Sequence, residues 1–347
     1  MVREKVTTSA MGGAKRIGFV DLAKGLCIIL VVYLHCAHQT EWGSIFDSWP
    51  QAFRMPLYFF LSGLFFKVYS GYWNFIKRKI NKLVIPFVFF FIASCLFFAV
   101  LYYTGIKTDK PFDWSSLYAF CIPSERLLIY NSPIWFLLCL FGLNLMFYPV
   151  YLLCDKMGKY KVHLMVIISL SVGLSGWSMG QYGFQLPFFL DTAMTCMPFF
   201  CMGYLFNKHS NILYPNKYDK YNYLLIIVLF TITTYFSISS SYRCNTFGNP
   251  VWLYTCGLTG TLGVMLLAKQ IKWLPCVSYW GRYSIMILVT HKILIQIYML
   301  AIPKFIDNNV IQTFVVLLIT LFSYMAIIPL FLKFLPYVTA QKDLIKV

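Results

Sequence analysis

Apolar runs of transmembrane length recur along the whole 347-residue chain, and they constrain its fold more than any other feature. A helix needs about 20 apolar residues to cross a bilayer core. Backbone groups in hydrocarbon must be hydrogen-bonded internally, so such runs predict helices. We therefore predict an all-α integral membrane protein with ten transmembrane helices, at residues 17–37, 51–69, 83–104, 132–153, 162–178, 186–206, 222–239, 251–268, 277–300 and 310–333.

The distribution of lysine and arginine predicts the topology. With ten spans and the amino terminus inside, most of the 29 basic residues fall in cytoplasmic segments. Both termini are then cytoplasmic, with residues 1–16 as an N-terminal segment, 17–333 as the membrane domain and 334–347 as a tail. The net charge of +17 is thus explained by topology, and no nucleic-acid partner is expected. The external segments hold only Lys107, Lys110, Arg126, Arg243 and Lys304.

The first run carries three ionisable residues, Asp21, Lys24 and His35, on one face of the expected helix. Lys24 and His35 are separated by ~20° around the axis and ~16 Å along it. Charged groups at membrane depth cost several kcal/mol, so they usually face a polar cavity or protein partners. The stripe therefore predicts a site. Alternatively, Lys24 snorkels to the cytoplasmic interface and His35 is an interfacial hydrogen-bonding residue.

The second run enters from the outside with Arg54 at about the depth of His35. Arg54 either belongs to the same site or contacts only lipid headgroups. Further along the run, Ser62 and Gly63 form a small-residue patch where another helix can approach closely.

The 11 cysteines show no metal-type spacing, and no metal ion is expected. Cys121 and Cys244 lie in different external loops and could pair in an oxidising compartment.

Several motifs occur in a fixed order along the chain: Asp21-Leu-Ala-Lys24-Gly25, then His35, Arg54-Met-Pro-Leu-Tyr-Phe-Phe-Leu-Ser-Gly63, Phe75-Ile-Lys-Arg-Lys-Ile-Asn-Lys-Leu-Val-Ile-Pro86, Pro133-Ile-Trp135-Phe-Leu137, Pro198-Phe-Phe-Cys-Met-Gly203-Tyr and Tyr283-Ser-Ile-Met-Ile-Leu-Val-Thr-His291. Together they resemble the membrane acyltransferase-3 family, in particular the fucose 4-O-acetylase-like polysaccharide O-acetyltransferases. The resemblance covers about residues 16–335. Lys24, Lys79 and Lys82 stand where the family usually has arginine, which keeps the charge without the bidentate fork.

The resemblance implies an O-acyltransferase in the inner membrane of a bacterium. Its donor would be acetyl-CoA or a similar acyl-CoA. Its acceptor would be a sugar hydroxyl of a cell-surface glycan or of the lipid-linked precursor. The residues expected to act in catalysis are His35 as general base, Lys24, Arg54 as oxyanion donor, and Asp191. Asp191 could orient His35 or bind a sugar hydroxyl, or it could simply be a partner of Arg54.

The residues expected to bind the anionic CoA are Arg78, Lys79, Lys82 and Arg282, and those expected to bind the saccharide are Glu125, Trp135 and His291. His291 lies about 180° around the ninth helix from Arg282, so both cannot face one cavity squarely. The alternative function is a proton-coupled transporter or a lipid-linked sugar flippase, since embedded ionisable groups also mark ion relays. Many transporters have interrupted helices at matching positions in their two halves, and the sequence shows no such pair. The position of His35 near the outer end of the helix favours an outward-facing or lipid-linked acceptor. The sequence does not identify the sugar or the acyl group.

Overall fold

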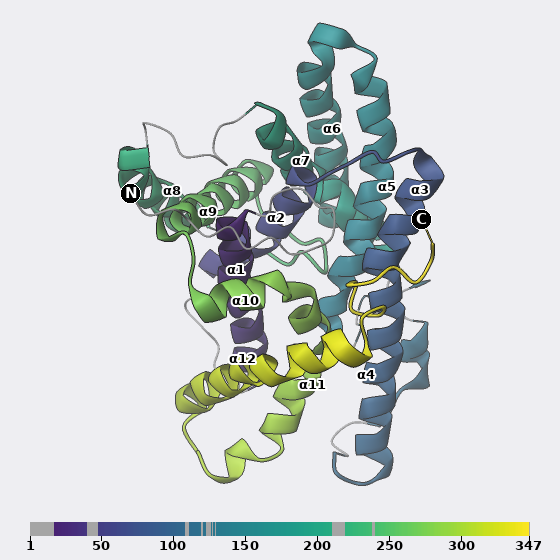
Figure 1. Ribbon diagram of the computed structural model, residues 1–347, viewed down its shortest axis with the longest axis vertical. Helices are drawn as coiled ribbons and strands as arrows, with labels where there is room; N and C mark the ends of the chain where they lie inside the picture. Colours follow the sequence, from purple (N-terminus) through teal and green to yellow (C-terminus); the bar gives the residue numbers. More distant parts are fainter. Residues whose placement is uncertain are drawn as a thin grey trace.

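The computed structural model describes residues 17–39, 48–107, 111–118, 121–122, 126, 128, 130–209, 219–237 and 240–346. Within these ranges the named elements are helices, apart from an isolated bridge between Ser241 and Thr246. The main ones, drawn in Figure 1, are α1 (Gly18–Gln39), α2 (Ser48–Leu64), α3 (Tyr72–Lys79), η1 (Ile80–Val84), α4 (Ile85–Tyr103), α5 (Trp135–Asp155), α6 (Lys161–Gln181), α7 (Leu190–His209), α8 (Asn222–Phe236), α9 (Pro250–Ile271), α10 (Pro275–Arg282), α11 (Ser284–Met299) and α12 (Asn309–Phe334).

The all-α membrane fold is confirmed. Seven helical segments of the described chain are long and apolar enough to cross a bilayer, and they contain α1, α4, α5, α6, α7, α9 and α12. The predicted runs at 51–69 and 222–239 also form helices, but α2 has 17 residues and α8 has 15. The number of crossings and the side of the termini stay predictions.

The predicted ninth run, 277–300, is not one helix. It divides at Tyr283, whose φ of −111° and ψ of 25° lie outside the helical region, into α10 and the 16-residue α11. The two helices run in different directions in Figure 1. α10 crosses α1 at close range, and α11 contacts α1 as well.

α1 is the central helix, in contact with α2, α9, α10, α11 and α12. Its crossing with α10 depends on two glycines. A methyl group added at Gly25 would lie 2.0 Å from the Val277 carbonyl oxygen, and one at Gly281 would lie 1.8 Å from that of Asp21. The Asp21–Gly25 segment is therefore fixed by backbone-to-backbone packing, which is how small residues bring helices together in membranes.

The predicted small-residue patch on the second run is confirmed as a helix crossing. A methyl group added at Gly63 on α2 would lie 1.9 Å from the Phe200 carbonyl oxygen on α7. A methyl group at Gly203 on α7 would lie equally close, 1.9 Å, to the Phe60 carbonyl oxygen on α2. This reciprocal contact fixes the depth of α2 and with it the position of Arg54.

Asparagine caps define the starts of two of the helices. The Asn249 side chain accepts a hydrogen bond from the Val251 N–H at 2.8 Å, and Pro250 occupies the first position of α9. The Asn308 side chain accepts from the Val310 N–H at 3.0 Å at the start of α12. Such caps satisfy backbone donors that the first helical turn leaves unpaired. The cap on α9 also fixes where the preceding loop, residues 240–249, has to end.

Candidate functional site

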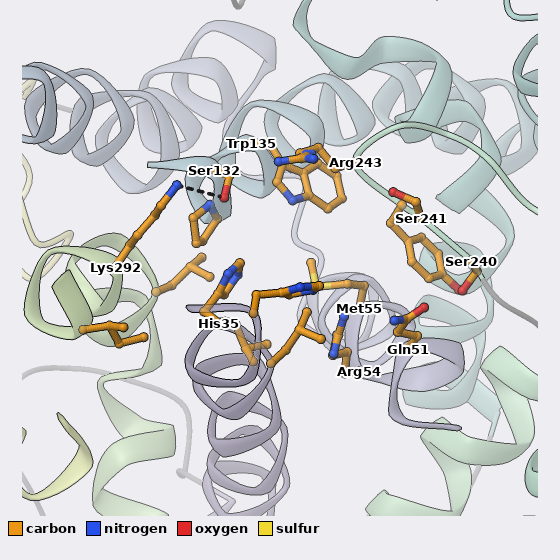
Figure 2. A pocket seen from close by; sticks show the side chains of 17 residues that line it. His35, Gln51, Arg54, Met55, Ser132, Trp135, Ser240, Ser241, Arg243 and Lys292 are labelled. Carbon is orange, nitrogen blue, oxygen red and sulfur yellow. Dashed lines mark hydrogen bonds between the residues drawn. The ribbon is translucent and has the colours of Figure 1, made fainter. Parts of the chain in front are cut away.

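A cavity of about 530 Å³ lies at the end of the bundle where α1 ends and α2 begins. Its walls come from α1, α2, the short helix η4 (Ser132–Ile134) with the start of α5, the turn at 240–243, and α11. Figure 2 shows His35 at the centre, Lys292 on one side, and Arg54 and Gln51 on the other. The lining residues are Val31, Leu34, His35, His38, Gln51, Arg54, Met55, Ser132, Pro133, Trp135, Ser240, Ser241, Tyr242, Arg243, Leu288, Lys292 and Ile295.

His35 and His291 form a pair at the inner wall of this cavity. Their ring centroids are 5.1 Å apart, with the ring planes tilted by 45°. His291 is fully buried, and its Nδ1 lies 2.8 Å from the Ile287 carbonyl oxygen. Because a carbonyl oxygen can only accept, Nδ1 must carry the hydrogen, and a neutral His291 therefore keeps its lone pair on Nε2. That Nε2 has no hydrogen-bond partner among the described residues.

Three cationic side chains reach the cavity from three separate elements. Arg54 comes from α2, Lys292 from α11, and Arg243 from the turn between α8 and α9. The Lys292 Nζ lies 3.5 Å from the Ser132 Oγ, the contact dashed in Figure 2, where Arg243 lies beside Trp135. No aspartate or glutamate occurs among the described residues that line the cavity. The described part of the lining therefore contributes basic side chains and no acidic ones.

A buried ion pair between Arg126 and Asp191 fixes the turn that supplies Arg243. The side chains are 5% and 0% exposed, and the Arg126 Nη2 contacts the Asp191 Oδ1. The Arg126 Nη1 donates to the Arg243 carbonyl oxygen at 3.1 Å. The neighbouring Thr192 hydroxyl donates to the Tyr242 carbonyl oxygen at 3.0 Å. The backbone of Arg243 is thus hydrogen-bonded to Arg126 of the charged pair, and the backbone of Tyr242 to Thr192 beside it.

The backbone just before α7 is strained where it approaches this pair. Phe188 and Phe189 adopt left-handed conformations, with φ of 56° and 59°. Each costs about 1–3 kcal/mol for a residue other than glycine. The strain places the Phe189 ring 5.6 Å from the Arg126 guanidinium carbon and 5.8 Å from the Trp135 ring. Phe189 therefore connects the ion pair to the cavity wall.

The residues predicted to bind CoA lie away from the cavity, and most of them contact aromatic rings. Lys24, which belongs to the same helix face as His35 in the prediction, lies 5.8 Å above the Phe65 ring near the end of α2. The other cation–ring contacts are Arg78 over Tyr69 at 4.6 Å, Lys79 over Phe75 at 5.3 Å, and Arg282, which is exposed, over Tyr283 at 5.3 Å.

Lys82 is bound by the C-terminal tail. Its Nζ donates to the Ala340 carbonyl oxygen at 2.8 Å and lies 3.0 Å from an Asp343 carboxylate oxygen. The adjacent Asn81 is fully buried, and its side chain exchanges two hydrogen bonds of 2.8 and 2.9 Å with the Ile345 backbone. Both residues lie in η1, a π-helical turn joining α3 to α4, and Figure 1 shows the tail beside α3. Such turns are frequent at functional sites.

The structure thus brings together three of the residues predicted for the site, His35, Arg54 and Trp135, with His291 directly behind His35. Asp191 is not in the lining and is paired with Arg126. Glu125 lies outside the described residues. Cys121 and Cys244 are free thiols.

Sequence reasoning missed Arg126 and Arg243, and it gave Lys292 no role. The sequence did contain a signal for the two arginines. External loops are usually poor in arginine by the positive-inside rule, and yet Arg126 and Arg243 both lie in predicted external loops.

A sequence model of an acyltransferase domain matches residues 17–331, nearly the whole chain. The chain belongs to the acyltransferase-3 family. Together with its apolar helices, this membership makes the protein a multi-pass membrane acyltransferase. No curated protein and no solved structure matches it. All the cavity-lining residues and both members of the buried ion pair fall within the matched region.

Proposed function

We propose that this membrane acyltransferase moves an acetyl group from acetyl-CoA to a saccharide hydroxyl bound in the cavity, with His35 as the general base. The observation that carries the proposal is the position of His35 in the wall of a cavity of about 530 Å³. Ligand sites usually measure roughly 300–1,000 Å³, so a sugar unit fits. Family membership supplies the reaction type, and the cavity supplies the place for the acceptor.

In the proposed step the acceptor hydroxyl attacks the thioester carbonyl while His35 removes the hydroxyl proton. The new bond joins the sugar oxygen to the acetyl carbon, and the bond from that carbon to sulfur breaks. His35 then returns the proton to the departing CoA thiolate, so the histidine ends as it began. A base placed within ~3 Å of the hydroxyl accelerates such a transfer by about 10²–10⁴.

Two further residues support this step. Arg54 enters the cavity from α2 and can donate hydrogen bonds to the oxyanion that forms on the carbonyl oxygen. His291 is a positioning residue: its Nε2 lone pair, next to the His35 ring, can accept a hydrogen bond from His35. That contact would leave the other nitrogen of His35 unprotonated and aimed at the acceptor.

The acyl donor is proposed to approach from the opposite end of α1, where Lys24 and the Lys77–Lys82 segment lie. On the predicted topology this end is cytoplasmic, the compartment that contains acetyl-CoA. The ~16 Å between Lys24 and His35 along the helix matches a donor with anionic phosphates at one end and its thioester at the other. Lys82 can join the donor site only if the tail residues Ala340 and Asp343 release it.

The acceptor is proposed to be a glycan, or its lipid-linked precursor, at the inner membrane of a bacterium. The test compares the surface glycan of cells that express the intact chain, His35→Gln or no transferase. Glutamine keeps hydrogen-bonding capacity but cannot take a proton at neutral pH. His163→Gln, at an exposed position on α6, is the matched control.

Mass spectrometry should find ester-linked acetyl groups with the wild type and with His163→Gln only. Acetyl esters retained in His35→Gln would rule out His35 as the base. Movement of the saccharide across the membrane without an ester would instead indicate the flippase.

A further inference from the structure

A buried asparagine, Asn131, directly precedes one wall of the cavity. It is 0% exposed and comes just before η4, whose residues Ser132 and Pro133 line the cavity together with Trp135. An asparagine at the start of a helical turn usually caps that turn with its side chain. The Asn131 side chain makes no such cap hydrogen bond. Its amide is thus available for contacts with other elements.

The amide nitrogen of Asn131 joins two distant helices. Its Nδ2 donates to the Ser94 Oγ on α4 at 2.8 Å and to the Val289 carbonyl oxygen on α11 at 2.9 Å, which are 37 and 158 positions away along the chain. Because a carbonyl oxygen can only accept, the nitrogen and not the oxygen of the amide faces Val289. The Ser94 hydroxyl in turn donates to the Phe90 carbonyl oxygen at 2.6 Å, which leaves its oxygen to accept from Asn131.

The hydrogen bond to α11 connects the cavity wall to the helix that stands behind the proposed base. Val289 is two residues before His291, whose ring centroid lies 5.1 Å from that of His35. On the wall side, the Asn131 carbonyl oxygen accepts from the Ile134 N–H at 3.4 Å. Asn131 therefore links the wall to the helix that carries one member of the histidine pair.

The proposed proton transfer requires this part of the cavity to keep its position. A general base has to lie within about 3 Å of the hydroxyl whose proton it removes. A displacement of about 1 Å can slow a reaction by about 10²-fold, even when its cause lies away from the reacting atoms. The wall at 132–135 bounds the space in which the saccharide would bind, and His35 bounds the same space from α1. The distance between the two decides whether a bound hydroxyl reaches the base.

We infer that Asn131 is a positioning residue for the acyl transfer, which holds the wall at 132–135 at a fixed distance from α11 and thereby keeps the acceptor hydroxyl within reach of His35. This inference rests on the proposed function. Asn131 does not line the cavity, so it acts through the wall and α11 and not by touching the substrate. The far end of the wall has an anchor of its own, because the Trp135 ring lies 5.8 Å from the Phe189 ring before α7. Asn131 fixes the near end.

The test variant is Asn131→Leu, which removes both hydrogen bonds and keeps nearly the same size. Neither partner loses its remaining bond, because Ser94 keeps its contact within α4 and Val289 keeps the backbone bond of its helix. The matched control is Asn144→Leu. Asn144 is also 0% exposed and does not line the cavity, and its Nδ2 donates to the Leu140 carbonyl oxygen at 2.7 Å within α5. If Asn131→Leu does not give a wild-type gel-filtration profile, Asn131→Ala, which adds no atom, carries the test.

The first measurement is the transfer of labelled acetyl from acetyl-CoA to surface glycan isolated from cells without the transferase. The full chain and its variants are compared in nanodiscs at equal folded amounts, below their unfolding temperatures. We expect Asn131→Leu to lower kcat by about tenfold or more. The KM for acetyl-CoA should change by less than about twofold, because the donor is proposed to approach from the other end of α1. A merely stabilising asparagine would lower Tm and leave kcat per folded molecule unchanged, as we expect for Asn144→Leu.

The second measurement reports on the wall without catalysis. The nine tryptophans of the chain are labelled as fluorotryptophan for fluorine NMR, and the Trp135 resonance is the one lost in Trp135→Phe. We expect a single sharp Trp135 resonance in the wild type and in Asn144→Leu. In Asn131→Leu this resonance should broaden or split, because a released wall takes more than one position.

A kcat for Asn131→Leu within about twofold of wild type per folded molecule would overturn the inference. So would slow transfer that Asn144→Leu shares, or slow transfer with an unchanged Trp135 resonance. If the wild type transfers no acetyl to the glycan, the proposed function fails, and the Trp135 resonance then decides whether Asn131 holds the wall: an unchanged resonance in Asn131→Leu would overturn that claim as well. Slow transfer confined to Asn131→Leu, together with a disturbed Trp135 resonance, supports the inference.

Discussion

Replacing Asp191 by leucine should destabilise the protein strongly, because the Arg126 guanidinium would stay buried without its carboxylate. Arg126 is 5% exposed and Asp191 is 0% exposed, so water can replace little of the lost interaction. Removing one partner of a buried ion pair costs about 3–5 kcal/mol. For a chain of this size, that loss lowers the unfolding temperature by on the order of 10 °C.

The assay is thermal unfolding of detergent-purified protein, followed by tryptophan fluorescence, for a double-mutant cycle. The set comprises Asp191→Leu, Arg126→Met and the double variant. Apolar replacement of both partners should recover most of the lost stability, because no buried charge is left uncompensated. The matched control is Asp155→Ala, which removes the Lys161–Asp155 pair, whose side chains are 26% and 50% exposed. An exposed pair of this kind contributes about 0–1 kcal/mol.

The same variants separate a structural role of Asp191 from the catalytic role expected from the sequence. If the pair acts by fixing the Arg243 turn, acetyl transfer should fall with stability in the single variants and recover in part in the double variant. The reasoning would be refuted if Asp191→Leu kept the wild-type unfolding temperature while losing transfer, with no recovery in the double variant. That result would place Asp191 in the chemistry.

Two further predictions concern packing at the α2–α7 crossing and the C-terminal tail. Gly63→Ala should sharply lower the yield of monodisperse protein on gel filtration, because the new methyl group would lie 1.9 Å from the Phe200 carbonyl oxygen. Gly18→Ala is the control and should behave as wild type, because a methyl group at Gly18 would have no atom within 4 Å. Equal yields of the two variants would contradict the close crossing. Asn81→Leu removes three hydrogen bonds to the tail backbone. Each of these hydrogen bonds contributes about 1 kcal/mol, so the tail should detach more often and tryptic cleavage at Lys342 should accelerate on the order of a hundredfold. An unchanged cleavage rate would show that Asn81 does not hold the tail.

The features that could be predicted from the sequence are those with a local cause. Apolar length predicts the helices, and the 3.6-residue period places Lys24 and His35 on one face at different depths. The close approach at Gly63 also follows from residue size alone. The separation of the cavity from the basic segment is a consequence of that spacing along α1.

The features that could not be predicted depend on contacts between distant segments. Arg126 and Asp191 are 65 positions apart, and Asn81 and Ile345 are 264 apart, with no periodic pattern linking either pair. The π-helical turn at η1 and the break at Tyr283 likewise reflect tertiary packing that overrides local propensity. In the sequence Arg243 is an ordinary loop residue, and its place in the cavity depends on the contact of its backbone with the distant Arg126.

The most direct test of the central claim, that His35 is the base for acetyl transfer, is the transfer rate in a purified system. Wild type, His35→Gln and His163→Gln are reconstituted at equal, folded amounts, and the transfer of labelled acetyl from acetyl-CoA to the isolated native glycan is followed. The account predicts that His35→Gln is at least about 10²-fold slower than the other two proteins. A rate for His35→Gln within a few-fold of wild type would contradict it.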